Sequence, residues 1–105
     1  MSAENDPFLD TLSDTESVTD LEEPGMYKVL LLNDHYTTMD FVVDVLRVVF
    51  HKSAGEATKI MLDVHKKGKG LVGLYPYDIA RTKVMQVTQM ADKAEFPLQC
   101  VLEEE

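Results

Sequence analysis

An abrupt change of hydrophobic period early in the chain constrains the fold more than any other feature. Residues 26–32, MYKVLLL, are short and apolar and predict a buried strand. Residues 41–50 carry apolar side chains at helical spacing and predict an amphipathic helix. Only a short polar stretch that includes Asn33, Asp34 and His35 separates the two. A strand followed at once by a helix indicates a domain in which helices pack against a sheet.

Hydroxyl side chains mark the start of this first helix. Thr37 or Thr38 can cap it, and Thr37 with Asp40 three residues later matches a loose capping box. Val43 and Val48 widen the apolar face on both sides. The sequence therefore predicts that the first helix is largely covered.

A second helix begins with a clearer signal. Ser53 is expected to be its N-cap, with Glu56 three residues later in position to cap reciprocally. The segment KKGKG at residues 66–70 is expected to end it, because glycine tolerates the left-handed geometry of a helix C-terminus. One apolar stripe is predicted to face the core: Ala57, Ile60, Met61 and Val64.

The remaining chain supplies two more strands and one more helix. Residues 71–75 predict a short strand, and Pro76 suits the first turn of a helix that runs to about residue 93. Residues 98–102 predict a third strand whose successive side chains point to opposite faces of the sheet. The order β-α-α-β-α-β predicts an α+β fold, a three-stranded, mainly antiparallel sheet packed on three helices.

Charge is unevenly distributed along the chain, and most of the net negative charge lies before residue 26. Residues 1–25 hold eight acidic and no basic side chains, a charge of −8, whereas residues 26–105 hold 11 acidic and 10 basic side chains, a charge of −1. We expect residues 1–25 to be a disordered acidic extension and residues 26–105 to be one core domain. The extension is either a solubilising arm or an interaction tail. Its acidity disfavours nucleic acid as a partner.

Cysteine usage and hydropathy indicate a cytoplasmic protein. The single cysteine, Cys100, excludes an intramolecular disulfide and lies in an apolar run, where it is expected to be a buried hydrophobe. No window approaches the length of a membrane-spanning helix.

The sequence holds weak signals for catalysis or a cofactor. It has no nucleophile elbow, no cysteine–histidine signature and no phosphate-binding loop. Asp34, His35, His51 and His65 are plausible metal ligands, but the three histidines lie on different elements and lack metal-site spacing. We therefore expect a protein that is not an enzyme and needs no metal or other cofactor.

The polar seam between the first strand and the first helix is the best candidate for a recognition site. Loops of this kind project polar groups over a rigid scaffold, although Asn-Asp pairs often only form a turn. Met61 and His65 are four residues apart and project in one direction. Methionines beneath hydrogen-bond acceptors would match an ammonium group beside an apolar side chain. The seam therefore favours a small pocket with an apolar floor and a polar mouth.

Three stretches together carry a family resemblance, with their order and spacing intact from residue 26 to about residue 103. MYKVLLLNDHYTTMDFVVDVL, ATKIMLDVHKKGKG and the pair DIARTKV and FPLQCVLEEE closely resemble the ClpS family of bacterial Clp protease adaptors. The resemblance implies a non-enzymatic adaptor that binds proteins with N-terminal Leu, Phe, Tyr or Trp. It also implies delivery of these proteins to the ClpA unfoldase for degradation by ClpP.

The resemblance also implies roles for individual residues. Asn33 and His65 would bond the α-amino group of the substrate, with Asp34 and His35 on the same rim. Asp78 and Lys83 would contact the N-terminal domain of ClpA, and residues 1–25 would engage the unfoldase. Met39 would exclude β-branched side chains from a pocket lined by Thr37, Met39, Val42, Met61, Val64 and Leu98.

The chain departs from the commonest family pattern at two positions of the seam. His35 stands where the family usually has an acid, and Thr38 stands where it usually has proline. Two other functions are open from the residues alone. One is a metal-dependent hydrolase that uses Asp34, His35 and His65, and the other is a plain protein-assembly module.

Overall fold

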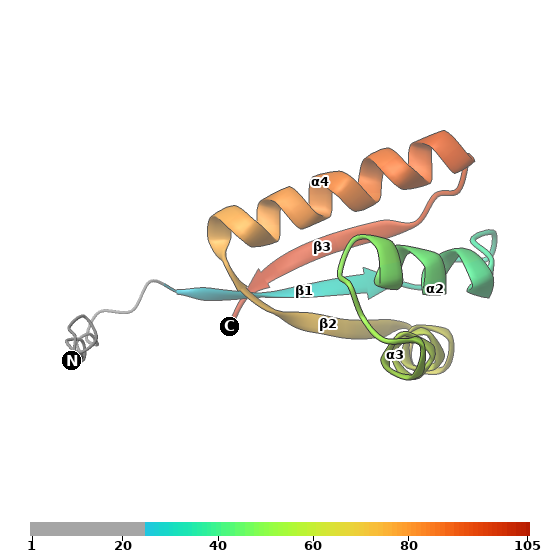
Figure 1. Cartoon of the computed structure of the whole chain (residues 1–105), viewed down its shortest axis with the longest axis horizontal. Coiled ribbons are helices and arrows are strands. Elements are labelled where there is room, and N and C mark those ends of the chain that lie inside the picture. The colour runs from blue at the N-terminus through green and yellow to red at the C-terminus, as the bar shows by residue number, and fades with distance from the viewer. Residues whose placement is uncertain (1–24) are drawn as a thin grey trace, which may run out of the picture.

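The computed structural model describes residues 25–105. Its elements follow the expected order (Figure 1): β1 (Met26–Leu32), α2 (Met39–Val48), α3 (Ala54–Lys67), β2 (Lys69–Pro76), α4 (Tyr77–Ala94) and β3 (Gln99–Glu104). The predicted α+β fold is confirmed. The expected acidic extension lies, except for Gly25, outside the described residues and stays a prediction.

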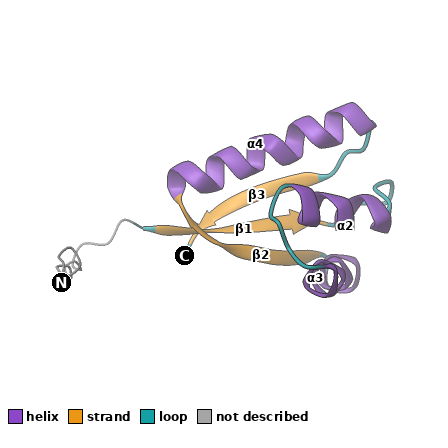
Figure 2. Cartoon of the chain, in the orientation of Figure 1, coloured by secondary structure: helices purple, strands orange, loops and turns teal. Residues whose placement is uncertain are grey.

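The three strands form one antiparallel sheet in the order β2-β1-β3. The most apolar strand, β1, therefore lies in the centre, where both of its edges are paired. Near the end of the sheet where β1 begins, the backbone N–H of Glu105 donates to the carbonyl of Met26 at 3.1 Å. The connections between elements are short (Figure 2), so the sheet and helices hold the loops at their ends in place.

Alternation along the central strand separates a core face from a second face of the sheet. Val29 and Leu31 are fully buried in the main hydrophobic cluster, whereas Leu30 lies outside this cluster. α4 packs against all three strands and α3 packs against β2 (Figure 1). The helices also supply buried residues to the cluster, namely Val42, Val45, Leu46, Ala57, Val64, Ala80, Val87 and Ala91.

The helix termini confirm one predicted cap and correct another. Ser53 and Glu56 form the expected capping box, in which the Glu56 N–H donates to Ser53 Oγ at 3.1 Å. Gly68 ends α3 with a left-handed φ of 90°. At α2 the N-cap is Thr38, whose hydroxyl accepts the Phe41 N–H at 3.1 Å. The predicted capping box of Thr37 is wrong, because the Thr37 hydroxyl donates to Asp34 instead.

Two further expectations differ from the structure. Pro76 is the last residue of β2 and precedes α4, because its φ of −58° and ψ of 156° are extended. Val48 is 61% exposed, so α2 is less covered than its composition predicts. The apolar residues of α2 reach around so much of the helix that neighbours packed on one side leave part of them in solvent.

Candidate functional site

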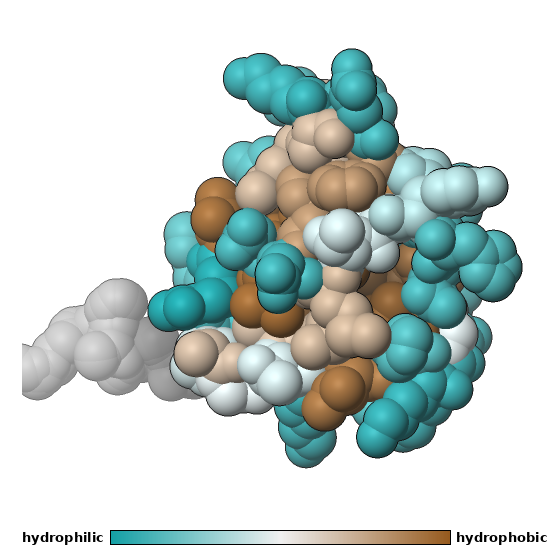
Figure 3. Space-filling model, turned by 90° about the vertical axis from the view of Figure 1, so that its right-hand side faces the viewer, coloured by the Kyte–Doolittle hydropathy of each residue, from teal (hydrophilic) through white to brown (hydrophobic). Residues whose placement is uncertain are grey.

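A hollow of about 440 Å³ lies where the loop after β1 meets the start of α2 and the last turns of α3. Figure 3 looks onto this end of the molecule and shows apolar surface with hydrophilic residues around it. The hollow has walls from the loop and from both helices. They are lined by Asn33, Asp34, His35, Tyr36, Thr37, Thr38, Met39, Val42, Met61, Val64 and His65.

One backbone hydrogen bond joins the loop wall of the hollow to the wall formed by α3. The N–H of Asn33 donates to the carbonyl of Gly68 at 2.9 Å, which ties the end of β1 to the C-cap of α3. His65 lies in the last turn of α3, three residues before this cap. Asn33 and His65, 32 positions apart in the chain, therefore line the same hollow and are both exposed at its mouth.

Asp34 organises the loop that forms the lip of the hollow. Its Oδ1 accepts the N–H groups of Tyr36 at 2.8 Å and Thr37 at 2.7 Å, and its Oδ2 accepts the Thr37 hydroxyl at 2.7 Å. Partial burial alone would raise the pKa of Asp34. The hydrogen bonds from Thr37 and Tyr36, together with nearby His35, outweigh burial and hold this pKa below its ordinary value. Asp34 is therefore a carboxylate that holds the turn in shape.

Apolar side chains from two helices form the floor. Val42 on α2 and Val64 on α3 are 5% and 3% exposed and also belong to the core, so the floor is rigid. Met39, the first residue of α2, is 44% exposed, and Met61 is half-buried. A hollow with two methionines on a rigid aliphatic base and polar groups at its mouth suits an amphipathic ligand with an apolar side chain.

The structure brings together nine of the ten residues that were predicted to bind ligand. The tenth, Leu98, is 6% exposed and lies in the core cluster, and it is not one of the lining residues. Two lining residues, Tyr36 and Thr38, were not predicted for this site. An aromatic residue beside three polar ones in a short loop was the available signal for Tyr36.

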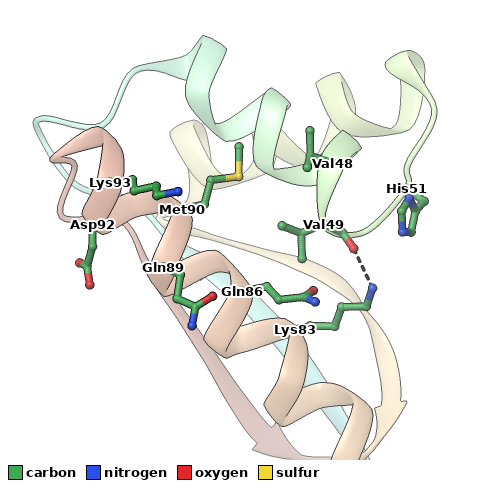
Figure 4. Close-up of a pocket in the computed structure, with 9 residues that line it drawn as sticks. All are labelled: Val48, Val49, His51, Lys83, Gln86, Gln89, Met90, Asp92 and Lys93. Atoms are coloured by element: carbon green, nitrogen blue, oxygen red, sulfur yellow. Dashed lines mark hydrogen bonds between the residues drawn. The ribbon is translucent and has the colours of Figure 1, made fainter.

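A larger hollow of about 900 Å³ lies between the end of α2 and the exposed side of α4 (Figure 4). Its walls are formed by Val48, Val49, His51, Lys83, Gln86, Gln89, Met90, Asp92 and Lys93. The ammonium group of Lys83 donates to the carbonyl of Val49 at 2.7 Å and lies 6.0 Å from the ring centroid of Phe50. Lys83 thus links α4 to the C-terminal end of α2. Asp78 is exposed in the first turn of α4.

Within residues 25–105, no cluster of three or more His, Cys, Asp or Glu side chains is arranged so that it could hold a metal ion. Asp34, His35 and His65 do share the smaller hollow, but the Asp34 oxygens are engaged in the loop. In the same range, no helix has the length and hydropathy to cross a membrane. Cys100 is buried, as expected, and burial raises its pKa to about 12, which makes it a poor nucleophile.

Comparisons with known proteins agree with the resemblance. The family model described as ATP-dependent Clp protease adaptor protein ClpS matches residues 22–101. The chain is 60% identical to the ATP-dependent Clp protease adapter protein ClpS of Acetivibrio thermocellus over 95 residues, which are 90% of this chain and 96% of that protein. It is 61% identical to the ClpS of Syntrophus aciditrophicus over 82 residues, 78% of this chain and 77% of the relative.

A solved structure is also similar. Agrobacterium tumefaciens ClpS2 bound to L-phenylalaninamide matches with a TM-score of 0.77 and 40% sequence identity. The match covers 79% of this chain and 100% of that one.

Proposed function

The chain belongs to the ClpS family of non-catalytic adaptors of the ATP-dependent Clp protease, and we propose that it binds protein substrates by their free N-terminal residue. The N-terminal residues that we assign to it are Leu, Phe, Tyr and Trp. The single observation that carries this proposal is the smaller hollow, which exposed polar side chains and buried apolar side chains line together. The similar Agrobacterium structure holds L-phenylalaninamide, a ligand with a free amino group beside a benzyl side chain.

In this proposal the mouth of the hollow binds the α-ammonium group. Asn33 offers its side-chain oxygen, and His65 in its neutral form offers a ring nitrogen as acceptor. His35 lies on the same lip and adds an acceptor without a negative charge. Asp34 contributes its charge and the fixed turn, since its oxygens already accept three hydrogen bonds from the loop.

The floor binds the first side chain of the substrate. The hollow, with a volume of about 440 Å³, lies at the small end of the roughly 300–1,000 Å³ range of small-molecule sites. Thr37, Met39, Val42, Met61 and Val64 form the walls in this proposal. Met39 stands half-exposed at the entrance, where it would contact a branch at Cβ of the ligand. Leu98 would support these walls from the core.

Neither part of the hollow is sufficient for tight binding. Burial of a Leu or Phe side chain contributes about 1.5–3 kcal/mol, and each hydrogen bond to a charged group contributes about 1.5–3 kcal/mol. Micromolar affinity needs about 8 kcal/mol after the costs of association. We therefore expect that loss of the free amine or of the apolar first side chain nearly abolishes binding.

Delivery is the second part of the proposal. Asp78 and Lys83 on α4 would contact the N-terminal domain of the unfoldase ClpA, and residues 1–25 would engage the unfoldase during delivery to ClpP. The exposed position of Asp78 supports a contact of this kind. The hydrogen bond of Lys83 to Val49 indicates that this lysine also has a structural role.

Fluorescence anisotropy with labelled peptides that differ only at residue 1 tests the proposal. Peptides that begin with Leu or Phe are expected to bind, whereas acetylated copies and copies that begin with Asp are expected to lose at least about tenfold, or 1.4 kcal/mol. Asn33→Ala and His65→Ala should each weaken binding by a similar factor. Equal binding of acetylated and free peptides would contradict the proposal.

A matched pair of methionine variants tests the role of Met39. Met39→Ala is expected to admit peptides that begin with Val or Ile, because it removes the side chain at the entrance. Met85→Ala is the control, since Met85 is also about half-exposed, at 49%, but lies outside the hollow. If both variants bind the same peptides as the unchanged protein, Met39 has no gating role.

A further inference from the structure

Tyr36 displays its side chain to solvent more than any other large hydrophobic residue of the described chain. It is 77% exposed, compared with 61% for Val48, the next most exposed. It also lines the smaller hollow, at the lip formed by the loop after β1. An aromatic ring in water at the mouth of an apolar pocket is surface that a bound molecule can cover.

The backbone beneath this ring is fixed, whereas the ring itself has no aromatic partner. The Tyr36 N–H donates to Asp34 Oδ1 at 2.8 Å, and two further bonds from Thr37 hold the same carboxylate. The aromatic pairs within residues 25–105 are Tyr27–Tyr77, Phe41–Phe96 and Phe50–Tyr75, which leave Tyr36 out. Burial in the core therefore does not account for this ring.

We propose that Tyr36 forms a subsite for the second residue of the substrate and favours an apolar side chain there. The inference rests on the proposed function. A first side chain that fills the hollow leaves the peptide to run out across the lip. Among the loop residues of the lip, Tyr36 alone has a large apolar side chain. Its turn is held by Asp34, so the backbone that carries the ring is fixed before the peptide arrives and little backbone ordering cost falls on the protein.

The expected effect is moderate. Covering about 50 Å² of apolar surface corresponds to roughly an eightfold gain in affinity. The ordering of a flexible peptide side chain offsets part of this gain. We therefore expect a peptide that begins Phe-Leu to bind about three- to fivefold more tightly than a peptide that begins Phe-Gly and is otherwise identical.

Anisotropy titrations of these two peptides against four proteins test the subsite. Tyr36→Ser should remove the preference for Phe-Leu over Phe-Gly. Tyr36→Phe should keep the preference, because the ring is retained and only the hydroxyl is lost. Val48→Ser is the matched control, since it removes the next most exposed large apolar side chain, which lies outside this hollow, and should keep the preference.

The possible outcomes separate the inference from the function on which it rests. A preference that disappears only in Tyr36→Ser supports the subsite. Equal affinities of the unchanged protein for both peptides overturn it, as does a Tyr36→Ser variant that weakens both peptides by the same factor. Failure of the unchanged protein to bind either peptide overturns the proposed function itself.

Discussion

Replacement of Gly70 by alanine tests whether the packing between β2 and α3 supports the smaller hollow. An added Cβ at Gly70 would lie 2.7 Å from Val64 Cγ2 and 3.0 Å from the carbonyl oxygen of Ile60. The Ile60 carbonyl is part of a helix backbone and cannot move away by rotation. Val64 is 3% exposed and lines the hollow, so its movement would disturb both the core and the site.

Two opposing terms set the size of the effect. Overpacking of a tight core site costs about 1–3 kcal/mol. The loss of glycine's freedom in the unfolded chain offsets about 0.4–1 kcal/mol of this cost. We expect a net destabilisation of about 1–2 kcal/mol, which lowers Tm by about 4–8 °C per kcal/mol in a domain of this size.

The assay is thermal and urea unfolding, followed by circular dichroism, with Gly55→Ala as the matched control. Beyond its chain neighbours and the nearby helix backbone, no atom lies within 4 Å of the position of a Cβ at Gly55, which is in the first turn of α3. Alanine there should raise stability by up to about 0.5–1 kcal/mol, because it favours the helix. Opposite signs for the same chemical change are the expected result. A Gly70→Ala protein as stable as the unchanged one would refute the packing argument.

Three further perturbations have defined outcomes. Lys83→Met removes the hydrogen bond to Val49 and should lower the free energy of unfolding in urea by about 1–2 kcal/mol, because the donor is charged but the lysine is only half-buried. Lys93→Met, at an exposed position on the same helix, is the control and should lower it by less than about 0.5 kcal/mol. The pKa of Asp34 is lowered in the folded state, so its contribution to stability is present above the ordinary carboxyl range near pH 4 and is lost as pH falls below it. Asp34→Asn should therefore be less stable than the unchanged protein at neutral pH, and its stability should fall less when the pH is lowered. A variant with the same pH profile of stability as the unchanged protein would contradict this. Cys100, with a pKa raised to about 12, should resist iodoacetamide at mild alkaline pH until the protein is unfolded, and rapid labelling of the folded protein would contradict its burial.

Local patterns in the sequence were reliable where the physics is local. The apolar run of β1, the capping box of Ser53 and Glu56 and the left-handed Gly68 depend on neighbours within a few residues, and each was confirmed. The cap of α2 was ambiguous because Thr37 and Thr38 have the same chemistry. The carboxylate of Asp34 decided it, since it binds the Thr37 hydroxyl and leaves Thr38 to the helix.

The candidate site was predicted in large part because its residues cluster in two short segments. The loop after β1 with the first turn of α2 and one face of α3 supply the lining, and helical spacing already placed Met61 beside His65. Tyr36 was overlooked, since a lone tyrosine in a polar loop has no periodic pattern to mark it. Leu98 was assigned to the hollow by the family resemblance, whereas in the structure it precedes β3, is 6% exposed and lies in the core cluster.

By itself the sequence determined which segments become strands and helices, because hydrophobic period and capping act within one or two turns of chain. It also determined the chemistry available to the site. Only the tertiary structure decided which of these segments meet. The bond from Asn33 to Gly68 and the bond from Lys83 to Val49 join residues about 35 positions apart in the chain. Such contacts follow from how whole elements pack, and no window of sequence contains both partners.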